Sequence, residues 1–513
     1  MTYHLTTYGC QMNTSDSERI ASVLENELGL TPARGNKADI LIFNLCSVRQ
    51  SAVNRIWGNF KGKKANGKCQ KKKPLIIFTG CILEPDRQKI IQKNGLILDI
   101  KDLPRWPKII IKTLKHKNIK TNKMLKYPPL YRGGAECKRG RGVSTVTPSN
   151  YLSITPEHSS SLTAYVPIMT GCNNFCAYCA VPYTRGREYS RPAEEILTEV
   201  TGLIKKGYKE IILLGQNVNS YHSGISNFQD TISKNNVSKI KNSQLIQNSK
   251  LKIENSHSTG FPALLKLIDN LPGHFWLTFF TSHPKDLSPE LIACFKNSKH
   301  LLPYLHLALQ SGSDKILKAM NRHYTAKNFS NLIKKIRQTD GNTTISTDII
   351  VGFPNETKAD FLATAKIMKA LKFDMAYLSE YSPRPLTAAA KLPDNISKAE
   401  KEKRKNTLNE ILKTTALANN QKLVGQTLEA LVSSSSNIHG TSSSVSGPSS
   451  SLRGISCLYG RTKNFKNVKI ITANNKQQTV NNKKLIGQFV NVKITKATAW
   501  NLEGELIRAG SGL

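Results

Sequence analysis

Between residues 161 and 395, short apolar runs alternate with stretches of helical periodicity about six times. Such runs, separated by segments of helical length, are typical of a parallel sheet whose crossover connections are helices. About six units are more than a small open sheet needs, so the pattern predicts a barrel, most simply a partial one of the (β/α)6 type. The runs expected to form its strands are AYVPIMT, EIILLG, WLTFFTS, LHLALQ, STDIIVG and MAYLSEY.

The same alternation occurs on a smaller scale over residues 1–115, with strand-like runs YHLTTYG, ADILIFNL and PLIIFTG. It predicts an open parallel-sheet α/β domain. Residues 116–160 are basic, contain Gly and Pro and show no periodicity, so we expect a linker. The Asn-, Ser- and Lys-rich segment 225–258 interrupts the barrel pattern and is expected to be a surface insertion without chemistry of its own.

The C-terminal part of the chain has a different pattern. A charged stretch over residues 396–424 predicts a helical linker. Residues 425–510 contain short alternating runs with Gly turns, which predict a small β-barrel. The Ser-rich segment 433–456 interrupts these runs and is expected to be a long, flexible hairpin insertion. The whole chain is therefore expected to be α/β followed by a small all-β unit.

Three cysteines, Cys172, Cys176 and Cys179, lie together in GCNNFCAYC, directly after the first predicted barrel strand. A zinc site would need a second pair at a suitable distance, and none follows. A thioredoxin-like redox pair would leave Cys172 unexplained. A four-iron cluster fits better, because three thiolates hold three irons and the fourth iron stays open for another ligand. A barrel places its active site on the loops after its strands, where this motif lies.

A second set of cysteines follows the strands of the N-terminal domain. Cys10, Cys46 and Cys81 each end one predicted strand, about one strand-helix-strand unit apart. Strand ends on the same edge of a parallel sheet converge on one crevice. A single buried cysteine would be an ordinary small core residue. Three at equivalent strand ends predict a second four-iron cluster, again with one open iron.

The charge balance points to a polyanionic partner. The chain has 74 Lys and Arg against 35 Asp and Glu, a formal charge of +39, and nucleic acid is the simplest partner for it. Codon bias is an alternative source of part of the excess, because the chain is also rich in Asn and Ile. No apolar run approaches the roughly 18 residues of a membrane span, and no signal peptide is evident. We expect a cytoplasmic protein whose ten cysteines are thiolates rather than disulfides.

The CxxxCxxC spacing, with Tyr178 before the last cysteine, resembles the signature of radical S-adenosylmethionine enzymes. The resemblance implies that the open iron binds S-adenosylmethionine and that an electron from the cluster cleaves it to a 5′-deoxyadenosyl radical. The segments LLGQNVNSY, LALQSGS and TDIIVGFPNE resemble the strand-end motifs that hold this cofactor. They give the candidate contacts Gly215, Gln216, Gln310, Ser311, Asp348 and Ile350, to which Ser282 and Arg322 are added by position.

The resemblance extends over nearly the whole chain. YGCQMNTSDSERI, FNLCSVRQSA, TGC, GCNNFCAYCAVPYTRGREYSRP and LQSGSDKILKAMNRHYT are similar to segments of the methylthiotransferase family, and LYGRTKNFKNVKI is similar to its tRNA-binding TRAM module. CQMN and GQNVNSY favour the branch that acts on isopentenyladenosine in tRNA. The sequence departs from the family pattern at NLCSV, LALQSGS and Asn355, and none of these departures removes a cysteine.

This resemblance implies that a methylthio group is attached to carbon 2 of N6-isopentenyladenosine 37, beside the tRNA anticodon. One cluster would generate the radical, the other would carry the sulfur, and two S-adenosylmethionine molecules would be used, one as methyl donor and one as radical source. The expected partners are the tRNA anticodon stem-loop and a reductant protein such as flavodoxin or ferredoxin, and we expect a monomer. Arg185, Arg187 and Arg191 are candidates for holding substrate or cofactor, with ordinary surface arginines as the alternative.

Two rival functions stay open on the sequence. The first is a related methylthiotransferase that acts on threonylcarbamoyl-adenosine in tRNA or on ribosomal protein S12. The second is a non-catalytic iron-sulfur regulator that binds RNA.

Overall fold

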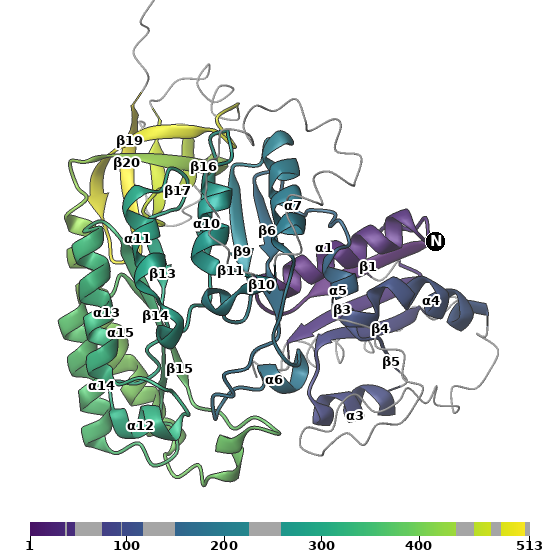
Figure 1. The fold of residues 1–513 in the computed structure, drawn as a ribbon, viewed down its shortest axis with the longest axis horizontal. Coiled ribbons are helices and arrows are strands. Elements are labelled where there is room, and N and C mark those ends of the chain that lie inside the picture. Colours follow the sequence, from purple (N-terminus) through teal and green to yellow (C-terminus); the bar gives the residue numbers. More distant parts are fainter. Residues whose placement is uncertain are drawn as a thin grey trace, which may run out of the picture.

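A computed structural model of the chain describes residues 1–35, 38–46, 74–93, 95–115, 149–224, 258–437, 456–472 and 484–507. Residues 225–257 of the predicted surface insertion and residues 116–148 of the predicted linker lie outside the described residues. Figure 1 shows the arrangement of the three parts, with the N-terminal sheet beside a larger strand-helix barrel and the C-terminal strands packed at one end of that barrel.

The N-terminal part is an open sheet in the order β2-β1-β3-β4-β5, and every neighbouring pair is parallel. Its strands are short, and among the described residues a helix lies between β1 and β2 and another between β4 and β5. The strands are β1 (Thr2–Thr7), β2 (Thr31–Pro32), β3 (Ile40–Cys46), β4 (Leu75–Cys81) and β5 (Leu96–Ile97). The helical elements are α1 (Gln11–Asn26), α3 (Glu84–Gln92), η2 (Ile100–Arg105) and α4 (Trp106–Lys115).

The end of the predicted linker belongs to this N-terminal core. Tyr151 and Leu152, in the short helix α5 (Ser149–Leu152), are each 1 % exposed and pack with the apolar side chains around Trp106. No pattern in the sequence indicates this packing, because two apolar residues in a polar stretch form no periodicity.

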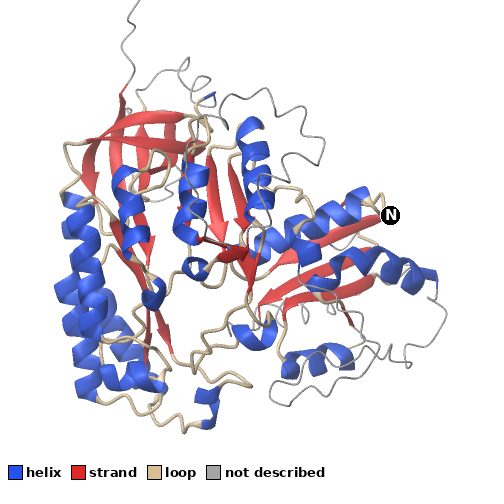
Figure 2. Ribbon diagram, in the orientation of Figure 1, coloured by secondary structure: helices blue, strands red, loops and turns tan. Residues whose placement is uncertain are grey.

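Six parallel strands form the central part, in two sheets of three that are linked by parallel bridges between Leu277 and Leu301 and between Ser282 and Leu307. The expected partial barrel is therefore confirmed, with its helices around the strands (Figure 2). The strands are β6 (Thr163–Pro167), β9 (Glu210–Leu214), β12 (Trp276–Phe279), β13 (Tyr304–His306), β14 (Thr344–Val351) and β15 (Met375–Glu380). The helices are α7 (Ala193–Lys205), α10 (Phe261–Asp269), α11 (Pro289–Asn297), α12 (Asp314–Ala319), α13 (Ala326–Thr339) and α14 (Lys358–Leu371).

Short elements occupy the connections after the barrel strands, where the candidate residues lie. They are β7 (Met169–Thr170), α6 (Val181–Thr184), β8 (Tyr189–Ser190), η3 (Val218–Ser220), β10 (His222–Gly224), β11 (Ser258–Gly260), η5 (Pro284–Asp286) and η6 (Ala388–Lys391). The apolar strands and the inner faces of the helices make one continuous core, so these connections start from a rigid frame.

Helix α15 (Lys398–Gln421) leads into a closed five-stranded barrel in the order β16-β17-β18-β20-β19. Its strands are β16 (Thr427–Asn437), β17 (Ser456–Thr462), β18 (Asn467–Ile471), β19 (Phe489–Ala497) and β20 (Asn501–Ile507). The first serines of the predicted insertion are not a loop, because β16 continues to Asn437 and pairs with β17. Residues 438–455 lie outside the described part. No helix among the described residues is long and apolar enough to cross a membrane.

Candidate functional site

The loop that carries Cys172, Cys176 and Cys179 follows β7 and is held by backbone hydrogen bonds. Gly171 has a φ of +79°, and a Cβ there would collide with the carbonyl oxygen of Arg187. The Cys172 amide donates to the Gly186 carbonyl at 3.2 Å, and the Cys179 amide donates to the Cys176 carbonyl at 2.9 Å. Burial, together with the charges of Cys176 and Cys172, raises the pKa of the Cys179 thiol to about 12. The three thiols therefore lie within electrostatic reach of one another.

Arg322 places a positive charge against this first triad. Its Nη1 donates to Cys176 Sγ at 3.4 Å, and its Nη2 donates to the Ala308 carbonyl at 2.9 Å. Arg322 is 7 % exposed, and burial alone would lower its pKa. Tyr178, Tyr324 and Cys176 instead raise the pKa of Arg322 above its ordinary value, so the guanidinium stays charged. A fixed cation beside a cysteine sulfur offsets the negative charge that the sulfur carries when it binds a metal.

The second triad meets at the C-terminal edge of the N-terminal sheet. The register of β3 and β4 places Cys46 directly opposite Cys81, and Cys10 precedes α1 at the end of the first strand unit. Cys46 and Cys81 are 5 % and 4 % exposed. Burial raises the pKa of Cys81 to about 12, Arg185 lowers it, and Cys46 and Cys10 raise it. The three strand-end cysteines thus lie within electrostatic reach of one another.

An amide pair fixes the backbone of this edge. The Asn13 Nδ2 donates to Asn44 Oδ1 at 3.0 Å and to the Leu45 carbonyl at 3.1 Å, while Asn44 Nδ2 donates to the Asn13 carbonyl at 2.8 Å. Gly80 has a φ of +95°, and a Cβ there would collide with Asn44 Oδ1 and with the backbone of Leu45. The glycine before Cys81 is therefore required by close packing of β4 against β3.

Both triads lie at the junction of the N-terminal sheet and the barrel. Arg185, which follows α6, donates from Nε to Cys81 Sγ at 3.1 Å. Burial lowers the pKa of Arg384, in the segment after β15, and the nearby charges of Asp86 and Cys46 act in the opposite direction. Figure 1 shows α6 between the barrel and the ends of β3 and β4. Residues from two barrel connections therefore reach the cysteines of the N-terminal sheet.

Among the described residues, no three His, Cys, Asp or Glu side chains converge on one point as the ligands of a single metal ion do. In a four-iron cluster each thiolate binds a different iron, so the sulfurs surround a cofactor rather than meet at an atom. Cys46 and Cys81 are buried and the other four cysteines are partly buried. With one arginine against each triad, they suit an anionic cluster of this kind.

Three candidate cofactor residues carry buried polar atoms with no hydrogen-bond partner in the described structure. These atoms are Gln216 Oε1, Ser282 Oγ and Gln310 Oε1. All three residues follow barrel strands on the side where the cysteine loop lies. Gln310 has a φ of +68°, in the left-handed region that is strained for a residue with a Cβ. Buried polar groups are normally paired, so these three atoms fit a polar ligand at the strand ends.

The other predicted contacts differ in what they touch. A Cβ on Gly215 would collide with Met169, and Ile350 and Tyr178 are partly buried in the apolar cluster around Phe353. Ser311 is fully buried and its hydroxyl lies 3.3 Å from that of Thr364. The Asp348 carboxylate lies 3.1 Å from His306 Nε2 and is 41 % exposed.

The remaining arginines of TRGREYSRP have different surroundings. Arg191 is 3 % exposed and donates to the Glu199 carboxylate at 2.7 Å and to the Pro167 carbonyl at 2.8 Å, so it is bound within the barrel. Arg187 is exposed and lies over the Phe175 ring at 4.5 Å.

His283 was not predicted. It is 5 % exposed next to Ser282, and its amide donates to Asn219 Oδ1 at 2.9 Å. Burial lowers its pKa to about 2, with Arg322 and Lys285 adding to the effect, so the ring is neutral. No motif in the sequence marks this histidine, because its place depends on the approach of the Arg322 segment from the next strand unit.

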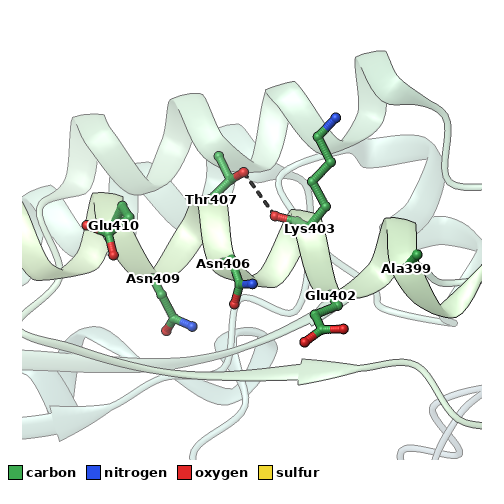
Figure 3. A pocket seen from close by; sticks show the side chains of 7 residues that line it. All are labelled: Ala399, Glu402, Lys403, Asn406, Thr407, Asn409 and Glu410. Carbon is green, nitrogen blue, oxygen red and sulfur yellow. Dashed lines mark hydrogen bonds between the residues drawn. The ribbon is translucent and has the colours of Figure 1, made fainter.

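A shallow hollow on the outer side of α15 is lined by Ala399, Glu402, Lys403, Asn406, Thr407, Asn409 and Glu410 (Figure 3). The Thr407 hydroxyl donates to the Lys403 carbonyl at 3.0 Å, a contact within the helix. Since α15 carries none of the cysteines or predicted cofactor residues, we assign the hollow no role.

Three known protein families match separate parts of the chain. The Radical SAM superfamily matches residues 166–368, the family described as Uncharacterized protein family UPF0004 matches residues 2–99, and the TRAM domain matches residues 454–507. The Radical SAM match contains the first cysteine triad, the second family contains the strand-end triad, and the TRAM match lies on the C-terminal barrel.

Curated relatives match almost the full length. A protein of Thermoanaerobacter sp. (strain X514) named tRNA-2-methylthio-N(6)-dimethylallyladenosine synthase is 35% identical over 510 residues, covering 98% of this chain and 92% of that one. A protein of the same name from Clostridium novyi (strain NT) is 34% identical, covering 98% and 96%. Among solved structures, the radical S-adenosylmethionine methyltransferase TsrM from Kitasatospora setae has a TM-score of 0.46 at 12% identity, covering 76% of this chain and 77% of that chain.

Proposed function

Because the chain belongs to the family of tRNA-2-methylthio-N(6)-dimethylallyladenosine synthases, we propose that it attaches a methylthio group to carbon 2 of N6-isopentenyladenosine 37 in tRNA. It is a radical S-adenosylmethionine enzyme, and an iron-sulfur cluster and S-adenosylmethionine are its cofactors. The observation that carries the proposal is identity of 34–35% over nearly the whole chain, with both cysteine triads present.

We assign one cluster to each triad. Cys172, Cys176 and Cys179 would hold the cluster that binds S-adenosylmethionine, and Cys10, Cys46 and Cys81 would hold the auxiliary cluster. When bound, these groups supply the radical that removes the aromatic hydrogen, together with the sulfur and methyl that replace it. The chain's own contribution is to place Arg322 and Arg185 beside sulfurs of the two triads, where their positive charges offset the negative charge of metal-bound thiolates.

The buried polar atoms at the barrel strand ends support the S-adenosylmethionine site. Gln216, Ser282 and Gln310 would form hydrogen bonds to the polar parts of the cofactor, since none has another partner for the atom concerned. Gly215 keeps the backbone close to Met169, where a side chain would not fit. Ser311 contributes less directly, because its hydroxyl already lies against Thr364.

The changes in S-adenosylmethionine affinity and in unfolding temperature together distinguish a cofactor-binding role for Ser282 from a structural one. Ser282→Ala is expected to weaken S-adenosylmethionine binding about tenfold, because a hydrogen bond of about 1.4 kcal/mol is lost. The same change is expected to leave the unfolding temperature unchanged or slightly raised, since it removes a buried hydroxyl that has no protein partner. Isothermal titration of the reconstituted protein and a thermal melt measure the two effects.

Thr278→Val is the matched control for this experiment. Its hydroxyl is also buried without a partner, but it lies within β12 rather than beyond the strand end. It should behave like Ser282→Ala in the melt and like the unchanged protein in the titration. An unaltered cofactor affinity in Ser282→Ala would remove Ser282 from the proposed site.

The C-terminal barrel supports a tRNA substrate. Along β19, the buried Val492 and Ile494 alternate with the exposed Lys493 and Lys496, and Trp500 beyond the strand is 43 % exposed. Lysines bind phosphates and an exposed ring stacks on unpaired bases, so this face suits an anticodon stem-loop.

We also propose a reductant protein such as flavodoxin or ferredoxin, a monomeric state and a cytoplasmic location.

The proposed reaction is tested by nucleoside mass spectrometry of tRNA from a deletion strain. We expect 2-methylthio-N6-isopentenyladenosine to disappear and its unthiolated precursor to accumulate. Loss of the methylthio group from threonylcarbamoyl-adenosine or from ribosomal protein S12 instead would assign the chain to one of those substrates. No change in any of them, combined with tRNA binding but no 5′-deoxyadenosine formation by the reduced protein, would identify a non-catalytic regulator.

A further inference from the structure

Arg185 joins the loop of the first triad to a cysteine of the second. It follows α6 and is 5 % exposed. Its Nε donates to Cys81 Sγ at 3.1 Å, and its Nη2 donates to the Asp16 carboxylate at 2.8 Å. The planar guanidinium therefore binds one residue of β4 and one of α1 at the same time, a geometry that the point charge of lysine does not reproduce.

Two atoms of this group have no partner among the described residues. Arg185 Nη1 and Asp16 Oδ1 are both buried without a hydrogen bond. An unpaired guanidinium N–H is costly inside a protein, and Nη1 shares its plane with the Nε that contacts Cys81. A cluster bound through Cys81 would bring an anionic acceptor close to this guanidinium.

We propose that Arg185 is a positioning residue for the second iron-sulfur cluster, fixing the Cys81 thiolate and raising the reduction potential of that cluster. This inference rests on the two-cluster assignment made above. Reduction by one electron adds negative charge to the cluster, so a buried cation hydrogen-bonded to a ligand sulfur stabilises the reduced form. Asp16 has the opposite effect, because its carboxylate offsets the charge of Arg185.

The inference is tested by redox titration of the second cluster alone, monitored by electron paramagnetic resonance. The full chain with Cys172, Cys176 and Cys179 replaced by alanine isolates that cluster. In this background Arg185→Gln should lower the reduction equilibrium constant about tenfold, which is about 59 mV for a one-electron couple. Asp16→Asn should shift the midpoint in the opposite direction, because it leaves the Arg185 charge uncompensated.

Arg187→Gln is the matched control, since Arg187 lies in the same segment but is exposed against Phe175. Its midpoint should equal that of the background. If Arg185→Gln loses iron while Arg187→Gln retains it, the positioning role is supported. In that case an upward shift of the midpoint potential in Asp16→Asn tests whether the Arg185 charge raises the reduction potential of the cluster.

Equal midpoints in Arg185→Gln, Asp16→Asn and the background would overturn the inference, as would shifts of the same sign. A background protein that binds no iron at all would contradict the two-cluster assignment instead, so the two failures are distinguishable.

Discussion

Replacement of Cys10, Cys46 and Cys81 together by alanine is expected to abolish methylthio insertion and to leave the cleavage of S-adenosylmethionine intact. The first triad and the strand-end polar groups lie on barrel connections, whereas these three cysteines belong to the N-terminal sheet. Removal of the second triad should therefore leave the radical site formed, while the substrate receives no sulfur. The variant should yield 5′-deoxyadenosine after reduction, no 2-methylthio nucleoside, and about four irons per chain instead of about eight.

Two further variants of the chain serve as controls for this experiment. The alanine triple variant of Cys172, Cys176 and Cys179 should lose both 5′-deoxyadenosine formation and the methylthio product. Cys457→Ala removes a fully buried cysteine of the C-terminal barrel and should lose neither, since that thiol is a core residue. Thiomethylated tRNA from the Cys10, Cys46 and Cys81 variant would contradict the role of these cysteines as sulfur carriers.

The positions of the strand-end cysteines could be predicted because parallel strands allow few alternatives. Once YHLTTYG, ADILIFNL and PLIIFTG are recognised as neighbouring parallel strands, their C-terminal ends must lie on one edge of the sheet. The register of β3 and β4 then places Cys46 opposite Cys81. The barrel could be predicted for a similar reason, because each of its apolar runs is short and is followed by a segment of helical length.

Contacts made by long side chains across the junction could not be predicted. Arg185 was only one of three arginines in TRGREYSRP, and nothing local distinguishes it from the exposed Arg187. The difference arises from tertiary structure, because Cys81 and Asp16 approach from the other sheet. The strand at Ser433–Asn437 was missed for a related reason: serine has little preference for strands, and backbone pairing with β17 extends β16 there.

Gly80→Ala is expected to destabilise the N-terminal sheet by about 3 kcal/mol and to release the second cluster. The new methyl group would meet Asn44 Oδ1 and the Leu45 backbone, and backbone atoms of a central strand cannot move aside as a flexible side chain can. Strands β3 and β4 would have to separate next to Cys46 and Cys81. A thermal melt and the iron content per chain measure the two effects, and 5′-deoxyadenosine formation should survive.

Gly425→Ala is the control that separates backbone strain at a positive φ from the steric collision of the new Cβ. Gly425 also has a positive φ, +86°, but a Cβ there would meet nothing within 4 Å. It should therefore cost only the backbone strain of about 1 kcal/mol and should leave the iron content unchanged. Gly171→Ala should release the first cluster and retain the second, because its Cβ would collide with the Arg187 carbonyl beside the first triad. Retention of the second cluster in Gly80→Ala would mean that this edge tolerates separation of its strands, and that the thiols do not depend on the fit between Gly80 and Asn44.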